Sequence, residues 1–201
     1  MSALFSPLGF TRGPEMKNRF MLAPLTNTQS GIDGVLSDEE FTWLTMRSEG
    51  GFGLTMTCAA HVQKNGQGFP GQLGVFSDDH IEGLTRLAKK INENESVSIC
   101  QLHHAGMRSP EALIGEAPVC PSADSKTGAR ALTTEEVESL VEDFILAALR
   151  AEKAGFNGVE IHGAHGYILG QFISPQINQR SDRYGGVLEN RTRIIFEIIE
   201  G

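Results

Sequence analysis

The sequence contains few cysteines, no block of basic residues and no long hydrophobic run. Only Cys58, Cys100 and Cys120 occur among the 201 residues, an odd number spaced too widely for a Cys-x-x-Cys metal or iron–sulfur motif. This pattern indicates reduced thiols and a cytoplasmic protein. The first residues, Met1–Pro7, lack the charged and apolar regions of a signal peptide, and no apolar segment is long enough to span a membrane.

Acidic residues outnumber basic ones, which limits the possible partners. The chain has 25 Asp and Glu residues against 17 Lys and Arg residues, a formal net charge of -8. Because nucleic acids and anionic membrane surfaces repel such a protein, the sequence predicts neither as a partner. Hydrophobic residues make up 40% of the chain, enough for a core, and the length predicts one domain or a little more.

Strand-like and helix-like segments alternate along the chain. Short apolar runs bounded by Gly or Pro predict strands over residues 19–23, 52–57, 97–102 and 157–161. Amphipathic stretches predict helices over residues 37–49, 78–94, 133–154 and from 189 onward. This alternation favours an α/β protein whose parallel sheet is covered by helices. Residues 4–17 predict an irregular hairpin that caps one end, and residues 107–132 predict a long loop without regular structure.

Two imidazoles and a phenol crowd the end of the fourth predicted strand. His162, His165 and Tyr167 are separated by glycines, which permit the chain to change direction sharply. In a parallel α/β protein, ligands bind at the C-terminal ends of the strands. A lone His there is usually structural and a lone Tyr usually packs in the core, but the three together favour a functional site with hydrogen-bond donors and a proton source.

Several stretches of the chain resemble the old yellow enzyme family of flavin-dependent oxidoreductases. They match in order and without gaps: Asn18–Thr26, Gly53–Ala60, Cys100–Gly106, Val159–Tyr167, Gln171–Pro175, Asn178–Gly186 and Glu189–Arg191. The resemblance implies a (β/α)8 TIM barrel, which typically needs about 250 residues. We therefore expect about four βα units here, with residues 1–201 forming the N-terminal half of an FMN-binding oxidoreductase domain.

The resemblance also implies the cofactors and the residues that hold them. FMN would be bound without a covalent link and reduced by NADH or NADPH. Pro24, Leu25 and Thr26 would contact the flavin at the end of the first strand, and Ala59 would let the ring approach the second. Gln101, at the end of the third strand, carries an amide that can serve both donor and acceptor atoms of the flavin pyrimidine.

The implied reaction is reduction of a C=C bond conjugated to a carbonyl or nitro group. His162 and His165 would bind the substrate's oxygen and stabilise the charge that develops there, as an oxyanion hole does. Tyr167 would protonate the α-carbon. His103 occupies a position of variable residue type in the family and is assigned no catalytic role. Cys58 stands where the family usually has an acidic residue.

Two alternatives remain open. A zinc hydrolase could use the imidazoles of His103, His104, His162 and His165 at two strand ends, although no carboxylate is placed to complete the site. Alternatively, a half barrel could act as a binding or assembly module without activity. Because open strand edges favour association, we expect either a homo-oligomer or pairing with the second half of the barrel.

Overall fold

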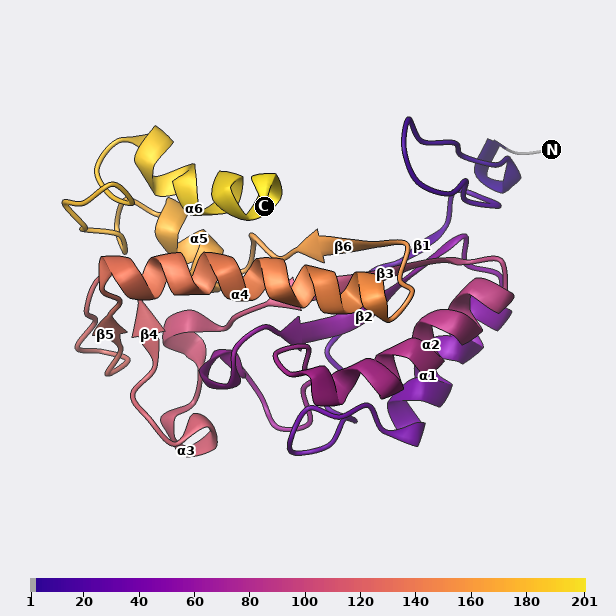
Figure 1. The fold of residues 1–201 in the computed structure, drawn as a ribbon, viewed down its shortest axis with the longest axis horizontal. Helices are drawn as coiled ribbons and strands as arrows, with labels where there is room; N and C mark the ends of the chain where they lie inside the picture. Colours follow the sequence, from indigo (N-terminus) through magenta and orange to yellow (C-terminus); the bar gives the residue numbers. More distant parts are fainter. Residues whose placement is uncertain (1–2) are drawn as a thin grey trace.

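The computed structural model describes residues 3–201 and contains one main parallel sheet. Its strands lie in the order β1 (Met21–Leu22), β2 (Leu54–His61), β3 (Val97–His103) and β6 (Gly158–Ile161). Strands that follow one another in the sequence are neighbours in the sheet, and helical crossovers connect them (Figure 1). The predicted alternation and the parallel sheet are therefore confirmed.

Helices cover one face of this sheet and contact one another in chain order. The long ones are α1 (Asp38–Glu49), α2 (Ile81–Glu93), α4 (Thr134–Lys153) and α6 (Leu188–Glu200). The short ones are α3 (Glu111–Ile114) and α5 (Ile168–Ile173), with single 3-10 turns at η1 (Ala3–Phe5), η2 (Lys64–Gly66), η3 (Asp78–His80) and η4 (Gly106–Arg108). In Figure 1, α4 runs along the sheet while α5 and α6 lie beyond its far edge.

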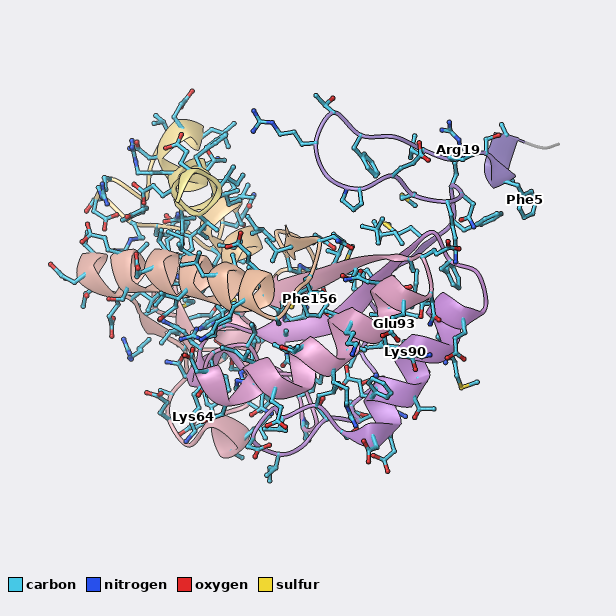
Figure 2. The ribbon with its side chains drawn as sticks, turned by 45° about the vertical axis from the view of Figure 1, so that its right-hand side comes forward. Phe5, Arg19, Lys64, Lys90, Glu93 and Phe156 are labelled. Atoms are coloured by element: carbon cyan, nitrogen blue, oxygen red, sulfur yellow. The ribbon has the colours of Figure 1, made fainter. Side chains whose placement is uncertain are left out.

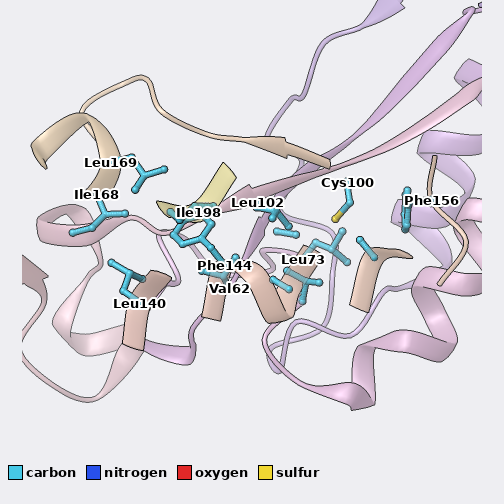
Figure 3. Close-up of a cluster of buried hydrophobic side chains, with 14 of the residues drawn as sticks. Val62, Leu73, Cys100, Leu102, Leu140, Phe144, Phe156, Ile168, Leu169 and Ile198 are labelled. Carbon is cyan, nitrogen blue, oxygen red and sulfur yellow. The ribbon is translucent and has the colours of Figure 1, made fainter. Parts of the chain in front are cut away.

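The core lies between the sheet and these helices. Cys100 and Leu102 point from β3 toward Leu140 and Phe144 of α4, and all four side chains are at most 1% exposed. Figure 3 shows this layer continuing to Ile198 of α6. Burying one large apolar side chain contributes roughly 1.5–3 kcal/mol, so this layer holds the helices to the strands.

The N-terminal segment caps the opposite face at one end of the strands. The backbones of Leu8 and Met16 exchange two hydrogen bonds, of 2.9 and 3.0 Å, which confirms the predicted irregular hairpin. Met16 packs against the inner face of β2 and β3, on Leu54, Met56 and Val97. Figure 2 shows Phe5 at this end and Lys64, just after β2, at the other. The hairpin thus covers the N-terminal ends of the strands and leaves their C-terminal ends uncovered.

Two helix starts show how similar sequence signals diverge. Thr133 and Glu136 form a complete capping box at α4, since each side chain accepts the other's backbone N–H. At α1 the oxygen of Ser37 accepts the N–H of Glu40 at 3.0 Å, but the Glu40 side chain turns inward and accepts a hydrogen bond from Ser30. Only half of a capping box therefore forms at α1, and Glu40 becomes a buried group.

Some predicted boundaries are wrong. The first strand has two residues, the second runs on to His61, and the fourth begins at Gly158. The loop over residues 107–132 is not free of regular structure, because it contains α3 and two short parallel strands, β4 (Val119–Cys120) and β5 (Arg130–Ala131). Val119 and Cys120 are buried, so their backbone groups need partners, and pairing with β5 supplies them.

The far edge of the sheet remains open. The residues of β6 are half-buried, and a groove of about 320 Å³ beside the strand is lined by Phe156, Val159 and Ile198. Phe196 and Ile199 of α6 are more than half exposed.

The three cysteines are free and buried. Within residues 3–201, no helix has the length and apolar character needed to cross a membrane.

Candidate active site

The inner face of the sheet carries a row of three side chains near the C-terminal ends of the strands. Ala59 of β2 lies opposite Gln101 of β3, which lies opposite Glu160 of β6. Paired residues of parallel strands point to the same face, so the row crosses three strands. The Gln101 amide donates to the Glu160 carboxylate at 3.3 Å. Ala59 and Gln101, the two residues of this row predicted to contact the cofactor, thus lie side by side.

One step further along the strands lies a cluster of aromatic side chains. The ring centroids of His162 and His165 are 5.1 Å apart, and those of His162 and Tyr167 are also 5.1 Å apart. His103, on the inner face of β3, places its ring 4.3 Å from Tyr167 and 5.4 Å from His162. The three predicted residues are therefore together, and His103, for which no catalytic role was predicted, lies among them.

The two histidines after β6 are bonded to each other. His162 Nδ1 accepts the N–H of Ala164 at 3.2 Å, so the ring proton of the neutral imidazole is on Nε2. His162 Nε2 lies 3.3 Å from His165 Nδ1 and donates to it, which leaves the proton of His165 on Nε2. Burial, followed by the nearby His165, lowers the pKa of His162, so it stays neutral near pH 7. In this structure the two imidazoles form a chain of hydrogen bonds that begins at the Ala164 N–H.

The turn that carries these residues is held from several sides. His165 has a φ of 57°, a left-handed conformation that is uncommon outside glycine. Arg108 donates to the His165 carbonyl at 2.6 Å and places its guanidinium carbon 5.0 Å from the centre of the Tyr167 ring. Gln171 of α5 donates to the carbonyls of Gly166 and Ala105. The ends of β3 and β6 are thereby tied together, with Tyr167 as the N-cap of α5.

The first predicted cofactor contact is separate from this cluster. Thr26 and Leu25 are exposed in the loop after β1, and Thr26 makes no side-chain hydrogen bond within residues 3–201. The loop is anchored a few residues later, where Ser30 donates to the fully buried Glu40. Glu40 lies beside Cys58, and burial, reinforced by that carboxyl, raises the pKa of the thiol. Cys58 therefore stands where the family usually has an acidic residue, and the carboxyl beside it is that of Glu40 in α1.

The histidine set does not form a metal centre. His104 Nδ1 accepts the N–H of Gly106 at 3.0 Å, and its Nε2 lies 3.1 Å from Gln63 Oε1, so both nitrogens have protein partners. Within residues 3–201, no group of three His, Cys, Asp or Glu side chains is arranged to hold a metal ion. The zinc interpretation therefore has no support from the geometry.

The donor set suits a flavin. Ala59 presents only a methyl group at the end of β2, which leaves room for a flat ring to approach the strand. Gln101 beside it has an amide oxygen with no hydrogen-bond donor in the described chain. The buried His103 Nε2 also lacks a partner. Uncharged donors and acceptors beside a small residue match a neutral ring that itself carries carbonyls and N–H groups.

Comparison with known proteins agrees with this geometry. The profile of the NADH:flavin oxidoreductase / NADH oxidase family matches residues 3–201. The "Probable NADH-dependent flavin oxidoreductase YqiG" of Bacillus subtilis is 41% identical over 98% of this chain and 54% of its own length. An NADPH dehydrogenase of Clostridium acetobutylicum is 42% identical over 92% of this chain and 55% of its own length. The chain thus spans about half the length of these relatives.

Solved structures extend the comparison to the fold. An old yellow enzyme homologue from Zymomonas mobilis superposes with a TM-score of 0.91 at 33% identity, over 98% of this chain and 59% of that one. A 2-naphthoyl-CoA reductase gives a TM-score of 0.95 at 31% identity, over 98% of this chain and 33% of that one. The predicted half-barrel architecture is confirmed. Because the family profile matches residues 3–201 and the fold superposes on solved members of the old yellow enzyme group, the chain belongs to the NADH:flavin oxidoreductase / NADH oxidase family, whose cofactors are FMN and NADH or NADPH.

Proposed function

We propose that residues 1–201 form the N-terminal half of an FMN-dependent barrel that uses NADH or NADPH to reduce an alkene conjugated to a carbonyl or nitro group. The observation that carries this proposal is the cluster of His162, His165 and Tyr167 near Ala59 and Gln101 on the inner face. Ala59 and Gln101, together with the backbone and short side chains of residues 24–26, would hold the flavin. Once reduced, bound FMN supplies a hydride to the β-carbon of the substrate.

The histidines act on the oxygen of the electron-withdrawing group. Negative charge develops on that oxygen as the alkene is reduced, and preorganised N–H donors stabilise it. His165 offers a free Nε2–H, and His162 supports it through their mutual hydrogen bond. Rotation of the exposed His165 side chain would release the His162 Nε2–H toward the same oxygen. His162 acts in its neutral form, since burial lowers its pKa.

Tyr167 completes the reaction as the proton donor. Its ring is held between His103 and the guanidinium of Arg108, which fixes the phenol at the edge of the cluster. Its hydroxyl group is an O–H donor that can deliver a proton to the α-carbon. The same proposal includes a cytoplasmic location. It also includes an assembly along the open edge of β6, which would pair either with another copy of the chain or with a second half of the barrel.

The Tyr167→Phe variant tests this role in the FMN-loaded protein. Stopped-flow absorbance follows flavin reduction by NAD(P)H and flavin reoxidation by an enone as separate steps. Loss of a general acid should slow the enone step roughly a hundredfold or more and leave flavin reduction nearly unchanged. Tyr184→Phe is the matched control, because it removes the other phenol, which donates to Glu197 at 2.7 Å away from the cluster. Equal losses in both steps would contradict the proton-donor role, and a purified protein without flavin bands would favour the binding module.

A further inference from the structure

His103 is buried in the candidate site with one nitrogen unsatisfied. Its side chain is fully buried, and its Nε2 has no hydrogen-bond partner within residues 3–201. A buried polar atom without a partner costs about 1–3 kcal/mol, and native proteins leave few of them. An unpaired atom beside Tyr167 and His162 therefore requires an explanation, which its other nitrogen provides.

The second nitrogen fixes where the ring proton resides. His103 Nδ1 lies 2.9 Å from Nε2 of Gln72. The orientation of the Gln72 amide is set independently, because its Oε1 accepts the N–H of Gly68 at 2.7 Å and its Nε2 donates to the Ala59 carbonyl at 3.0 Å. The amide nitrogen can only donate, so His103 Nδ1 must accept. In a neutral imidazole the proton is then on Nε2, and the unsatisfied atom is an N–H donor.

The surroundings keep this imidazole neutral. Burial lowers the pKa of His103 well below its usual value, and the neighbouring His162, His104, His61 and Arg108 act in the same direction. Tyr167 packs edge-to-face on the ring, which holds the ring in place without offering a hydrogen-bonding oxygen. The donor is thus fixed in tautomer, charge and orientation before any ligand arrives.

We propose that His103, held as the Nε2–H tautomer by Gln72, is a third donor to the ligand oxygen bound beside Tyr167, next to His162 and His165. This inference rests on the proposed function and names one more residue of that same site. Gln72 is then a positioning residue that acts through the imidazole. The ligand chemistry is an oxygen acceptor, which could belong to the substrate or to the flavin, and we assign it to the substrate because His103 contacts Tyr167 and His162.

The tautomer can be measured without turnover. In protein carrying ¹⁵N-labelled histidine, NMR should show Nδ1 of His103 bare and Nε2 protonated near neutral pH. Gln72→Glu replaces the donating amide by an accepting carboxylate and should move the ring proton to Nδ1, whereas Gln72→Met should leave no fixed tautomer. A wild-type spectrum with the proton on Nδ1 would overturn the inference.

Ligand binding gives the second measurement, with small phenols as probes on the FMN-loaded protein. His103→Phe keeps a flat ring against Tyr167 but removes the donor, and should weaken phenol binding about tenfold, the effect of one hydrogen bond. His103→Gln restores an N–H and should recover most of the affinity. His104→Asn is the control, since the nitrogens of His104 have partners outside the cluster, and it should leave phenol affinity unchanged.

The remaining outcomes separate the sources of the oxygen. If His103→Phe leaves phenol affinity unchanged but weakens FMN binding or shifts the flavin midpoint potential, the donor serves the flavin and our assignment is wrong. If His162→Ala abolishes phenol binding while His103→Phe has no effect on any of these quantities, this inference fails and the proposed function stands. If neither variant affects phenol binding, the proposed function fails with it.

Discussion

His104 should make the protein sensitive to mild acid. The side chain is 1% exposed, and both of its nitrogens have fixed partners, the N–H of Gly106 on Nδ1 and the Gln63 oxygen beside Nε2. Protonating Nδ1 would place a donor against the Gly106 donor in a buried site. Burial, with a further contribution from His61, lowers the pKa of His104 to about 3.

The size of the effect follows from proton linkage. In the unfolded chain the His104 pKa returns to 6.5, so below that pH the unfolded state binds a proton that the folded state refuses. Stability contributed by the neutral imidazole is therefore present above pH 6.5 and is lost as the pH falls toward 3. At pH 5 the difference is about 1.5 pH units, or about 2 kcal/mol at 1.36 kcal/mol per unit. Burial also lowers the pKa of His61, to about 4, so its contribution to the free energy of unfolding should fall by a similar amount at pH 5.

Urea unfolding of wild type and His104→Asn at pH 7.5 and at pH 5 tests this reasoning. The variant keeps an acceptor for Gly106 but loses the bond to Gln63, so it should be less stable at pH 7.5. When the pH is lowered from 7.5 to 5, the free energy of unfolding should fall by about 2 kcal/mol less in the variant than in wild type. Gln63→Met is the control, because it removes the same hydrogen bond and keeps the buried imidazole. If His104→Asn loses as much as wild type on acidification, the imidazole is not the source.

Two further predictions concern the candidate site and Glu40, the buried carboxyl bonded to Ser30 in the loop after β1. Small phenols should bind the FMN-loaded protein as phenolates and produce a long-wavelength charge-transfer band. The His162→Ala, His165→Ala double variant should lose this band. If the double variant still shows the band and binds phenols with unchanged affinity, the two histidines do not have this role. Glu40 has a pKa raised by burial, so its stability cost grows as the pH rises above 4.5. Glu40→Gln should gain up to about 1.4 kcal/mol relative to wild type per pH unit above that value, measured by urea unfolding, and a pH-independent difference would refute it.

The sequence predicted the elements whose signals are local and repeated. Buried apolar runs and helical periodicity located the four strands and their covering helices, and the matched motifs placed His162, His165 and Tyr167 together. Capping residues placed the start of α4, because the side chains of Thr133 and Glu136 each accept the other's backbone N–H. Such features depend on residues three or four apart, which a single sequence shows directly.

Features that depend on distant partners were missed. Glu40 has the right spacing for a capping box, but burial next to Ser30 redirected its side chain, which no local pattern indicates. The parallel pairing of β4 with β5 joins segments ten residues apart inside a Gly- and Pro-rich loop. His103 could have been found, since the alternation of a strand places it on the same face as Gln101. Nothing in the sequence around Gln72 marks it as the partner of that imidazole.

Fixed tautomers determine what kind of site these residues can form. Gln72 holds the ring proton of His103 on Nε2. The backbone N–H of Ala164 holds the ring proton of His162 on Nε2, and this N–H donates a hydrogen bond to His165. Because His103 and His162 are held neutral by burial, the cluster offers N–H dipoles with no charge of its own. Dipoles that are already oriented stabilise a developing oxyanion without reorganising, and unlike cationic imidazoles they leave the oxygen unprotonated. In the proposed reaction the proton required at the α-carbon must then come from a separate group, and we propose Tyr167 for that role.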